Sequence, residues 1–139
     1  MNKIHIIASF GGHLVQLTEI TDSLQHKYII TTEDIGNNSF NLPDCNFNTP
    51  FKAILCLISS MQIIIKEKPK YVITTGALPG LIYLICSRLF GAKTLWIDSL
   101  ANSEKVSRCC ILAQYLSNQC ITQWPKLQTK RIKYKGSIL

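Results

Sequence analysis

The chain has 139 residues, of which 47% are apolar and 17% charged, and its formal net charge is +7. This length suits one domain with a real core, and the composition excludes a disordered chain. We expect no room for a second catalytic lobe. The whole positive excess lies in residues 105–139, which contain seven basic and no acidic side chains. Such a segment indicates an anionic partner, which could be lipid headgroups, nucleotide phosphates or nucleic acid.

The six cysteines form no CxxC pair, and Met1 leads directly into a strand without a signal peptide. These features predict a protein of the reducing cytoplasm with no metal site. We expect Cys56, Cys86 and Cys120, which lie in apolar runs, to be small core residues. Nucleic acid is disfavoured as a partner, because the basic segment has few aromatic residues and no nucleic-acid-binding signature.

The first element is a strand over Lys3 to Ala8, where β-branched and apolar residues follow one another. Residues 9–13 form a turn, and helical spacing resumes over Leu14 to Leu24. The paired glycines of this turn let backbone N–H groups at a helix N-terminus approach a ligand closely. The sequence therefore predicts a binding site for an anionic or sugar ligand at this turn.

Strands and helices then alternate along the chain. Further strands are predicted at residues 27–32, 71–75, 93–97 and 119–123. Further helices are predicted at residues 51–68, 79–90 and 106–116, while residues 33–50 form a long loop. This order predicts an α/β fold, a Rossmann-like doubly wound parallel sheet of about five strands with helices on both faces.

Two of these helices are apolar nearly all round, at Ala53 to Ile65 and at Leu78 to Phe90. Both are too short to cross a bilayer, which takes about 20 apolar residues. Either both are core helices, or one leaves an apolar face for a membrane surface. Basic side chains that could reach the headgroups flank them, namely Lys52, Lys66, Lys68 and Arg88.

Three loops follow strand ends and are expected to share one rim of the sheet, at residues 9–13, 74–80 and 98–104. His13 is the titratable group of most interest there, because a neutral imidazole at a helix N-terminus can take a proton from a hydroxyl nucleophile. The alternative is that His13 only caps its helix. His5 and His26 are expected to be structural.

A dinucleotide site is a weaker interpretation. Glu33 or Asp34 lies about where a ribose-binding carboxylate is expected. However, the turn at residues 9–13 has only Gly11 and Gly12, and no GxGxxG motif occurs. No Walker lysine, GxSxG elbow or HExxH motif occurs either. A free-standing nucleotide-binding enzyme remains an alternative function.

Five segments resemble one protein family in order and spacing. They are residues 9–14 (SFGGHL), 74–77 (TTGA), 96–99 (WIDS), 122–127 (TQWPKL) and 134–138 (YKGSI). The family is that of the bacterial capsular and exopolysaccharide glycosyltransferase enhancer subunits, which are similar to the anchoring subunit of the eukaryotic dolichol-linked N-acetylglucosamine transferase. Two departures occur: Phe10 stands where the family has a small residue, and residues 98–102 (DSLAN) replace its Glu-Ser-x-x-Arg loop.

The resemblance implies a single domain over residues 1–139, equivalent to the N-terminal half of a split GT-B glycosyltransferase. Such a subunit would bind peripherally to the anionic cytoplasmic face of the cell membrane and hold a polyprenyl-pyrophosphate-linked saccharide acceptor. A small catalytic partner chain would bind the UDP-sugar, and no cofactor is implied. The alternative is a non-catalytic scaffold that only recruits this partner to the membrane.

The residue patterns and the resemblance together predict roles for particular residues. His13 would act as general base. The acceptor contacts would be Gly11, Gly12, Gly76, Asp98, Ser99, Asn102 and Glu104. The interface with the partner and the membrane would comprise Trp124, Pro125, Leu127, Lys130, Arg131 and Lys133.

Overall fold

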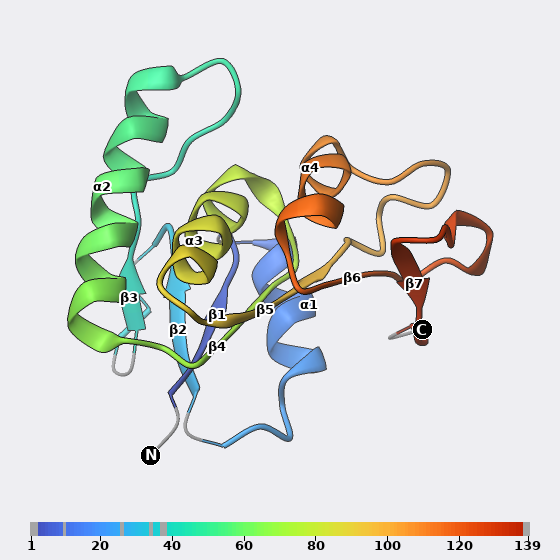
Figure 1. Ribbon diagram of the computed structural model, residues 1–139, viewed down its shortest axis with the longest axis horizontal. Helices are drawn as coiled ribbons and strands as arrows, with labels where there is room; N and C mark the ends of the chain where they lie inside the picture. Colours follow the sequence, from blue (N-terminus) through green and yellow to red (C-terminus); the bar gives the residue numbers. More distant parts are fainter. Residues whose placement is uncertain (1–2, 10, 26, 34, 37–38, 138–139) are drawn as a thin grey trace.

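A computed structural model describes residues 3–9, 11–25, 27–33, 35–36 and 39–137. They form an α/β domain around one parallel sheet with strand order β3-β2-β1-β4-β5-β6-β7 (Figure 1). The strands are β1 (Ile4–Ile7), β2 (Lys27–Thr31), β3 (Ser39–Asn41), β4 (Tyr71–Thr74), β5 (Lys93–Ile97), β6 (Gln119–Thr122) and β7 (Ile132–Tyr134). The helices are α1 (Gly12–Ile20), α2 (Pro50–Glu67), α3 (Ala77–Leu89), α4 (Arg108–Leu116) and the short 3₁₀ helix η1 (Pro125–Leu127).

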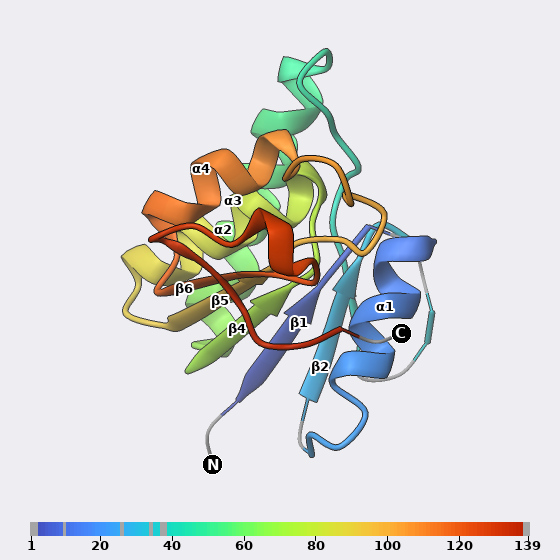
Figure 2. The ribbon, with the colours of Figure 1, turned by 90° about the vertical axis from the view of Figure 1, so that its right-hand side faces the viewer.

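Helices lie on both faces of the sheet, as the sequence predicts. Helices α2, α3 and α4 form a layer on one face, and within the described residues α1 lies on the other (Figure 2). Because the strands have apolar side chains on both faces, each helix layer buries its own cluster. Ile7, Val72 and Tyr83 belong to the cluster under α2 and α3, and Leu17 packs with Ile6 under α1.

The strand order reverses between β1 and β4, two neighbouring strands inside the sheet. In a parallel sheet the loops that leave such a pair depart in opposite directions, which opens a crevice at the carboxyl ends of the strands. The chain leaves β1 into the Gly11–Gly12 turn and β4 into the Gly76–Ala77 turn. The fold thus brings two glycine turns to the mouth of one crevice.

The predicted number of strands, about five, is two fewer than the structure has. Residues 33–50 are not a continuous loop, because β3 pairs with β2 at Ile29, Ile30 and Thr31. Likewise, β7 pairs with β6 within the basic C-terminal segment. Each of these edge strands has three residues, too few for a hydrophobic alternation to be recognised in the sequence. Phe10, His26 and Asp34 lie outside the described residues.

The cysteine prediction is confirmed, since Cys56, Cys86 and Cys120 are buried in the core. Burial raises the pKa of the Cys56 thiol to about 12, so this side chain stays neutral. All six cysteines are free thiols. In the described part of the chain, no group of three or more His, Cys, Asp or Glu residues could hold a metal ion.

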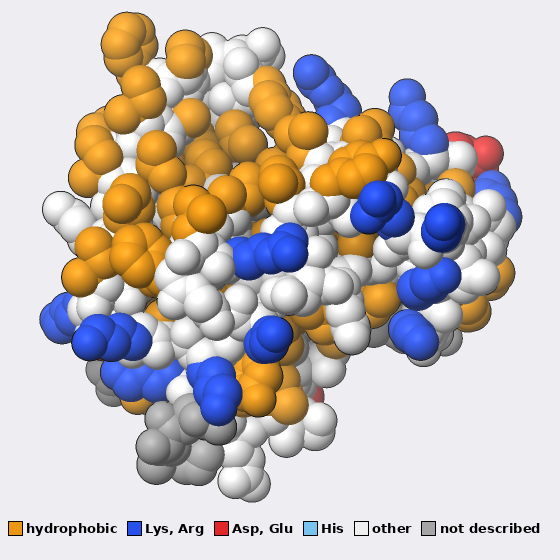
Figure 3. Space-filling view, in the orientation of Figure 1, with side chains coloured by type: hydrophobic (Ala, Val, Ile, Leu, Met, Phe, Trp, Pro, Cys, Tyr) orange, Lys and Arg blue, Asp and Glu red, His pale blue; other side chains and the backbone are white. Residues whose placement is uncertain are grey.

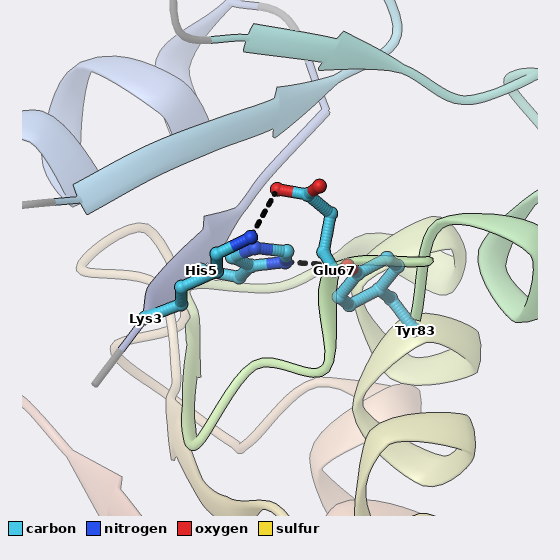
Figure 4. A network of polar contacts seen from close by, with 4 residues as sticks. All are labelled: Lys3, His5, Glu67 and Tyr83. Atoms are coloured by element: carbon cyan, nitrogen blue, oxygen red, sulfur yellow. Dashed lines mark hydrogen bonds and ion pairs between the residues drawn. The ribbon is translucent and has the colours of Figure 1, made fainter. Parts of the chain in front are cut away.

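His5 is fully buried in β1, among aromatic rings. Its Nδ1 is hydrogen-bonded to the Tyr83 hydroxyl at 2.6 Å, whereas its Nε2 is buried and has no hydrogen-bond partner among the described residues (Figure 4). Burial lowers the pKa of His5 to about 4, and the nearby Glu67 carboxylate opposes this shift only in part. The imidazole is therefore neutral at neutral pH, as expected for a structural histidine.

Candidate functional site

A pocket of ≈ 400 Å³ lies at the carboxyl ends of β1, β4 and β5 and contains several of the candidate polar groups. Its lining comes from all three loops that the sequence places at one rim. The lining residues are His13, Gly76, Ala77, Asp98, Asn102, Lys105, Val106, Ser107, Arg108 and Cys109. The predicted convergence of the three loops is confirmed.

His13 occupies the first turn of α1 and faces the turn after β4. The Thr75 hydroxyl donates a 2.7 Å hydrogen bond to the His13 carbonyl and so ties the two turns together. A Cβ on Gly76 would lie 3.0 Å from His13 Cε1 and 3.1 Å from its Nδ1, at a backbone φ of +138°. Only glycine suits both the conformation and the close approach. Gly76 thus leaves the space that the imidazole occupies.

The His13 ring has one buried nitrogen without a partner. This atom, Nδ1, makes no hydrogen bond to any of the described residues. A buried nitrogen without a hydrogen bond costs free energy, and this one faces Gly76, where an added Cβ would lie 3.1 Å away. The imidazole as a whole lines the pocket, and a ring nitrogen of a neutral histidine can accept a hydrogen bond from a hydroxyl.

Asp98 holds the start of α4 in place. Its carboxylate oxygens accept hydrogen bonds from the Ser107 hydroxyl at 2.6 Å and from the Ser107 backbone N–H at 3.0 Å. The Ser107 hydroxyl in turn accepts from the Cys110 N–H at 3.1 Å and caps the helix. Asp98 is only 1% exposed. Its carboxylate therefore orients the α4 N-terminus at the pocket.

Gln16 on α1 fixes the loop that follows Asp98. Its amide donates to the Ser99 hydroxyl at 3.1 Å and accepts from the Leu100 N–H at 3.0 Å. The Gln123 amide donates to the same Gln16 oxygen and to the Asp98 carbonyl, both at 3.1 Å. Sequence patterns do not reveal the contacts of Gln16, because 83 to 107 positions separate the partners in the chain.

Two cations border the pocket, Lys105 and Arg108, both exposed. The Arg108 guanidinium stacks on the Phe47 ring with 4.7 Å to the ring centroid, which restrains it at the rim. The first residues of α3 and α4 also line the pocket, and helix N-termini favour an anion. The sequence patterns did not predict either cation at this site. Their position shortly after the loop at residues 98–104 could have indicated it.

The pocket also contains a thiol that is not reactive. Burial raises the pKa of Cys109 to about 11, and the charge of Asp98 adds to this effect. A neutral, buried thiol is a poor nucleophile, so Cys109 does not supply a nucleophile to the pocket.

Several of the other predicted site residues lie outside the pocket lining. Gly11 and Gly12 are exposed at the start of α1, and the Ser99 hydroxyl bonds to Gln16 and is not part of the pocket lining. Glu104 is outside the lining as well and forms an exposed ion pair with Lys126 at 3.2 Å. The structure thus groups His13, Gly76, Asp98 and Asn102 in one pocket and leaves Glu104 apart from them.

The predicted interface segment packs beside the same loop. The Trp124 indole N–H donates a 2.7 Å hydrogen bond to the Leu100 carbonyl, and the residue is half-buried. Pro125 and Leu127 belong to η1. Exposed basic side chains follow on the way to β7 and within it, namely Lys130, Arg131 and Lys133.

Comparison with solved structures identifies the architecture. The chain superposes on MurG of Acinetobacter baumannii with a TM-score of 0.78 at 13% identity, covering 96% of this chain and 45% of that one. It superposes on a UDP-N-acetylglucosamine 2-epimerase of Rickettsia bellii with a TM-score of 0.74 at 15% identity, covering 99% and 45% respectively. A glycosyltransferase of Rickettsia africae gives a TM-score of 0.60 at 12% identity, with 94% and 41% covered.

No family model and no curated protein matches the sequence. The chain therefore has the Rossmann-like fold of the GT-B glycosyltransferases and their structural relatives, and it spans less than half the length of these neighbours. The fold is thus Rossmann-like, and the pocket lies where the strand order of the sheet reverses.

Proposed function

We propose that this chain is the acceptor-binding and anchoring subunit of a two-component glycosyltransferase. Its partner would supply the UDP-sugar, and the acceptor would be a saccharide linked to a polyprenyl pyrophosphate, as in capsular or exopolysaccharide synthesis. The observation that carries this proposal is the composition of the pocket. A proton acceptor, His13, and two cations, Lys105 and Arg108, surround a volume of ≈ 400 Å³ at the carboxyl edge of a GT-B-like sheet.

These groups match the two ends of such an acceptor. A pyrophosphate needs positive charge and N–H donors, which Lys105, Arg108 and the α3 and α4 N-termini supply. The attacking sugar hydroxyl needs a base at hydrogen-bond distance, and the His13 imidazole, which lines the pocket, is the candidate for this role. In the resembling family an arginine occurs in the loop where this chain has Asn102. Lys105 and Arg108 border the same pocket and can supply that charge here.

Reconstitution of the two components tests the proposal. We expect the purified chain alone neither to bind UDP-N-acetylglucosamine tightly nor to transfer sugar, because one lobe offers only one side of a GT-B cleft. Mixing it with the product of the neighbouring reading frame should create transfer to a polyprenyl-pyrophosphate-linked saccharide that neither chain performs alone. Robust transfer by the lone chain would contradict the two-component assignment.

The same assay tests His13. His13→Ala should lower turnover by about 10²- to 10⁴-fold, the contribution of a positioned general base, while partner binding by calorimetry stays unchanged. Val15→Ala, at an exposed position on the same helix, is the matched control and should retain wild-type turnover. If His13→Ala keeps activity within twofold of wild type, His13 is not a general base and has only a structural role in the turn.

A further inference from the structure

Helix α2 presents most of its larger apolar side chains outward rather than toward the core. Its buried residues are Cys56, Ser60 and Ile64, two of which are small. Phe51 is 82% exposed, and Ile54 and Ile58 are about half exposed, at 52% and 49%. An ordinary surface helix has the opposite arrangement, with its polar side in water. The outward side of α2 is therefore suited to a surface that removes it from water.

This apolar surface continues beyond α2. Leu89 and Phe90 at the end of α3 are exposed, as are Ile111, Leu112 and Tyr115 on α4. Figure 3 shows apolar side chains gathered over α2 and extending across the helix layer toward α4. We call this surface, formed by the outward sides of α2, α3 and α4, the helix-layer face. A contiguous exposed apolar surface of this kind marks an interaction site.

The charge of the helix-layer face is almost all positive. Helices α2, α3 and α4 carry four basic residues and one acidic residue, Glu67. The Glu67 side chain is only 12% exposed and is paired with Lys3 at 3.2 Å. The exposed basic residues around the face are Lys52, Lys66, Lys68, Arg88 and Arg131, the last stacked on the Tyr115 ring at 4.7 Å.

A hollow between the C-terminal ends of α2 and α3 combines both properties. It encloses ≈ 420 Å³, its apolar lining includes Ile64, Ile65 and Phe90, and Lys68 and Lys70 also line it. Such a hollow can take an apolar chain while two ammonium groups meet an anionic headgroup.

From these features we propose that the helix-layer face docks on an anionic lipid bilayer, with α2 lying lengthwise in the interface. A symmetric contact between two copies of the chain is disfavoured, because it would bring the same basic residues of both copies together. A bilayer with anionic headgroups satisfies the apolar centre and the basic surroundings at once. Among the described residues, no helix combines the length and the apolar character that a membrane span requires.

This orientation deepens the proposed function and rests on it in one respect, the lipid-linked acceptor. The pocket is lined by the first residues of α3 and α4, so it lies at one end of the helix-layer face. A bilayer under this face would bring the pyrophosphate of a lipid-linked acceptor to Lys105 and Arg108 without lifting its polyprenyl chain out of the membrane.

Flotation with vesicles tests the proposal on the full chain. One set of vesicles is pure phosphatidylcholine, and the other contains phosphatidylglycerol as well. Wild-type protein should float with the anionic set. The double variant Ile54→Asn, Ile58→Asn should lose at least about tenfold in partitioning, since two half-exposed isoleucines no longer enter the interface. Because both side chains are exposed, circular dichroism should show an unchanged fold.

Matched variants elsewhere on the surface complete the design. Val15→Asn, 58% exposed on α1 on the other face of the sheet, should keep wild-type flotation. A double variant of the C-terminal segment, Lys130→Gln, Lys133→Gln, should reduce flotation less than the double variant Lys52→Gln, Lys66→Gln at α2. The proposal would be overturned if the α2 variant and the Val15 variant lost flotation equally, or if the α2 variant kept wild-type flotation.

Two further measurements distinguish lipid binding at the helix-layer face from dimer formation, and the lipid proposal from the proposed function. If the wild type fails to float but forms dimers that the α2 variant abolishes, the face binds a second copy and the lipid assignment is wrong. Transfer in detergent to an acceptor with a short, soluble polyprenyl chain should be unaffected by the α2 variant. If the α2 variant loses flotation but retains transfer, the lipid assignment is supported. If the wild type floats but shows no transfer, only the proposed function is refuted.

Discussion

At the scale of single residues, some polar side chains at the rim of the sheet are hydrogen-bonded to other described residues, and others have no such partner. The Asp98 carboxylate accepts hydrogen bonds from Ser107 and the Trp96 indole, and the Ser99 hydroxyl accepts from Gln16 and the Ala101 N–H. His13 Nδ1, by contrast, has no partner among the described groups. Asp98 and Ser99 thus position the loop, whereas the His13 imidazole lines the pocket.

The buried His5 makes stability depend on pH. Its pKa is about 4 in the folded chain and 6.5 for a histidine in water, so between these values the unfolded chain binds more protons. The free energy of unfolding should fall as the pH drops from about 6.5 toward 4, by about 3 kcal/mol in all from this group. Urea denaturation at pH 7, 6, 5 and 4.5 measures the effect.

The variant His5→Gln is the control for this prediction, because other groups also titrate in the same window. Its stability at pH 7 should be lower, since the packing against Tyr83 is disturbed. The difference in stability between wild type and variant should shrink as the pH falls. A difference that stays constant from pH 7 to pH 4.5 would show that His5 does not resist protonation.

Among the elements, the junction between β4 and α3 depends on close packing. A Cβ on Gly80 would collide with the Thr74 hydroxyl, so the first turn of α3 lies directly on the end of the strand that leads into it. The Ser87 and Thr21 hydroxyls bond back to carbonyls four residues earlier, as buried polar groups commonly do. Gly80 therefore sets how deeply α3 sits on the sheet, and with it the position of Gly76 next to His13.

Gly80→Ala should destabilise the fold by about 1–3 kcal/mol, the usual cost of overpacking a buried site. Gly12→Ala is the matched control, because a Cβ there meets nothing within 4 Å and alanine favours a helix more than glycine does. Thermal denaturation followed by circular dichroism should show a lower Tm for the first variant and an unchanged or higher Tm for the second. Equal Tm values would contradict the packing assigned to Gly80.

The outward face of α2 shows a limit of sequence patterns at this scale. Residues 53–65 are so uniformly apolar that their periodicity does not indicate which side meets the sheet. The sequence left both a core helix and a helix with an exposed apolar face open. Packing decides in favour of the second, because the side of α2 that is buried is the narrow one formed by Cys56, Ser60 and Ile64.

At the scale of the whole molecule, charge and apolar surface should act together in membrane binding. Exposed basic residues border the helix-layer face, and residues 105–139 carry seven basic side chains without an acidic one. Each cation that comes near an anionic bilayer contributes about 1 kcal/mol. Raising the salt from about 0.1 M to about 1 M shortens the Debye length from about 10 Å to about 3 Å and should release much of the protein from anionic vesicles. Binding that is insensitive to salt, or equal on neutral vesicles, would contradict an electrostatic contribution.

The sequence alone determined the α/β class, the central strands and the loops that share one rim of the sheet. These features follow from short-range rules: β-branched runs make buried strands, Gly-Gly-His and Thr-Gly-Ala turns follow them, and their alternation with helices favours a parallel order. The edge strands β3 and β7 were not recognisable by these rules, because three residues are too few to form a pattern.

Only the tertiary structure decided which side chains act together. Gln16, Ser99 and Gln123 form one network although they are far apart in the chain, and Lys105 and Arg108 join His13 at a pocket that no local motif marks. The side of α2 that faces water was likewise settled by packing. Long-range contacts of this kind depend on how the layers fit in three dimensions, and a chain's local preferences do not encode that fit one segment at a time.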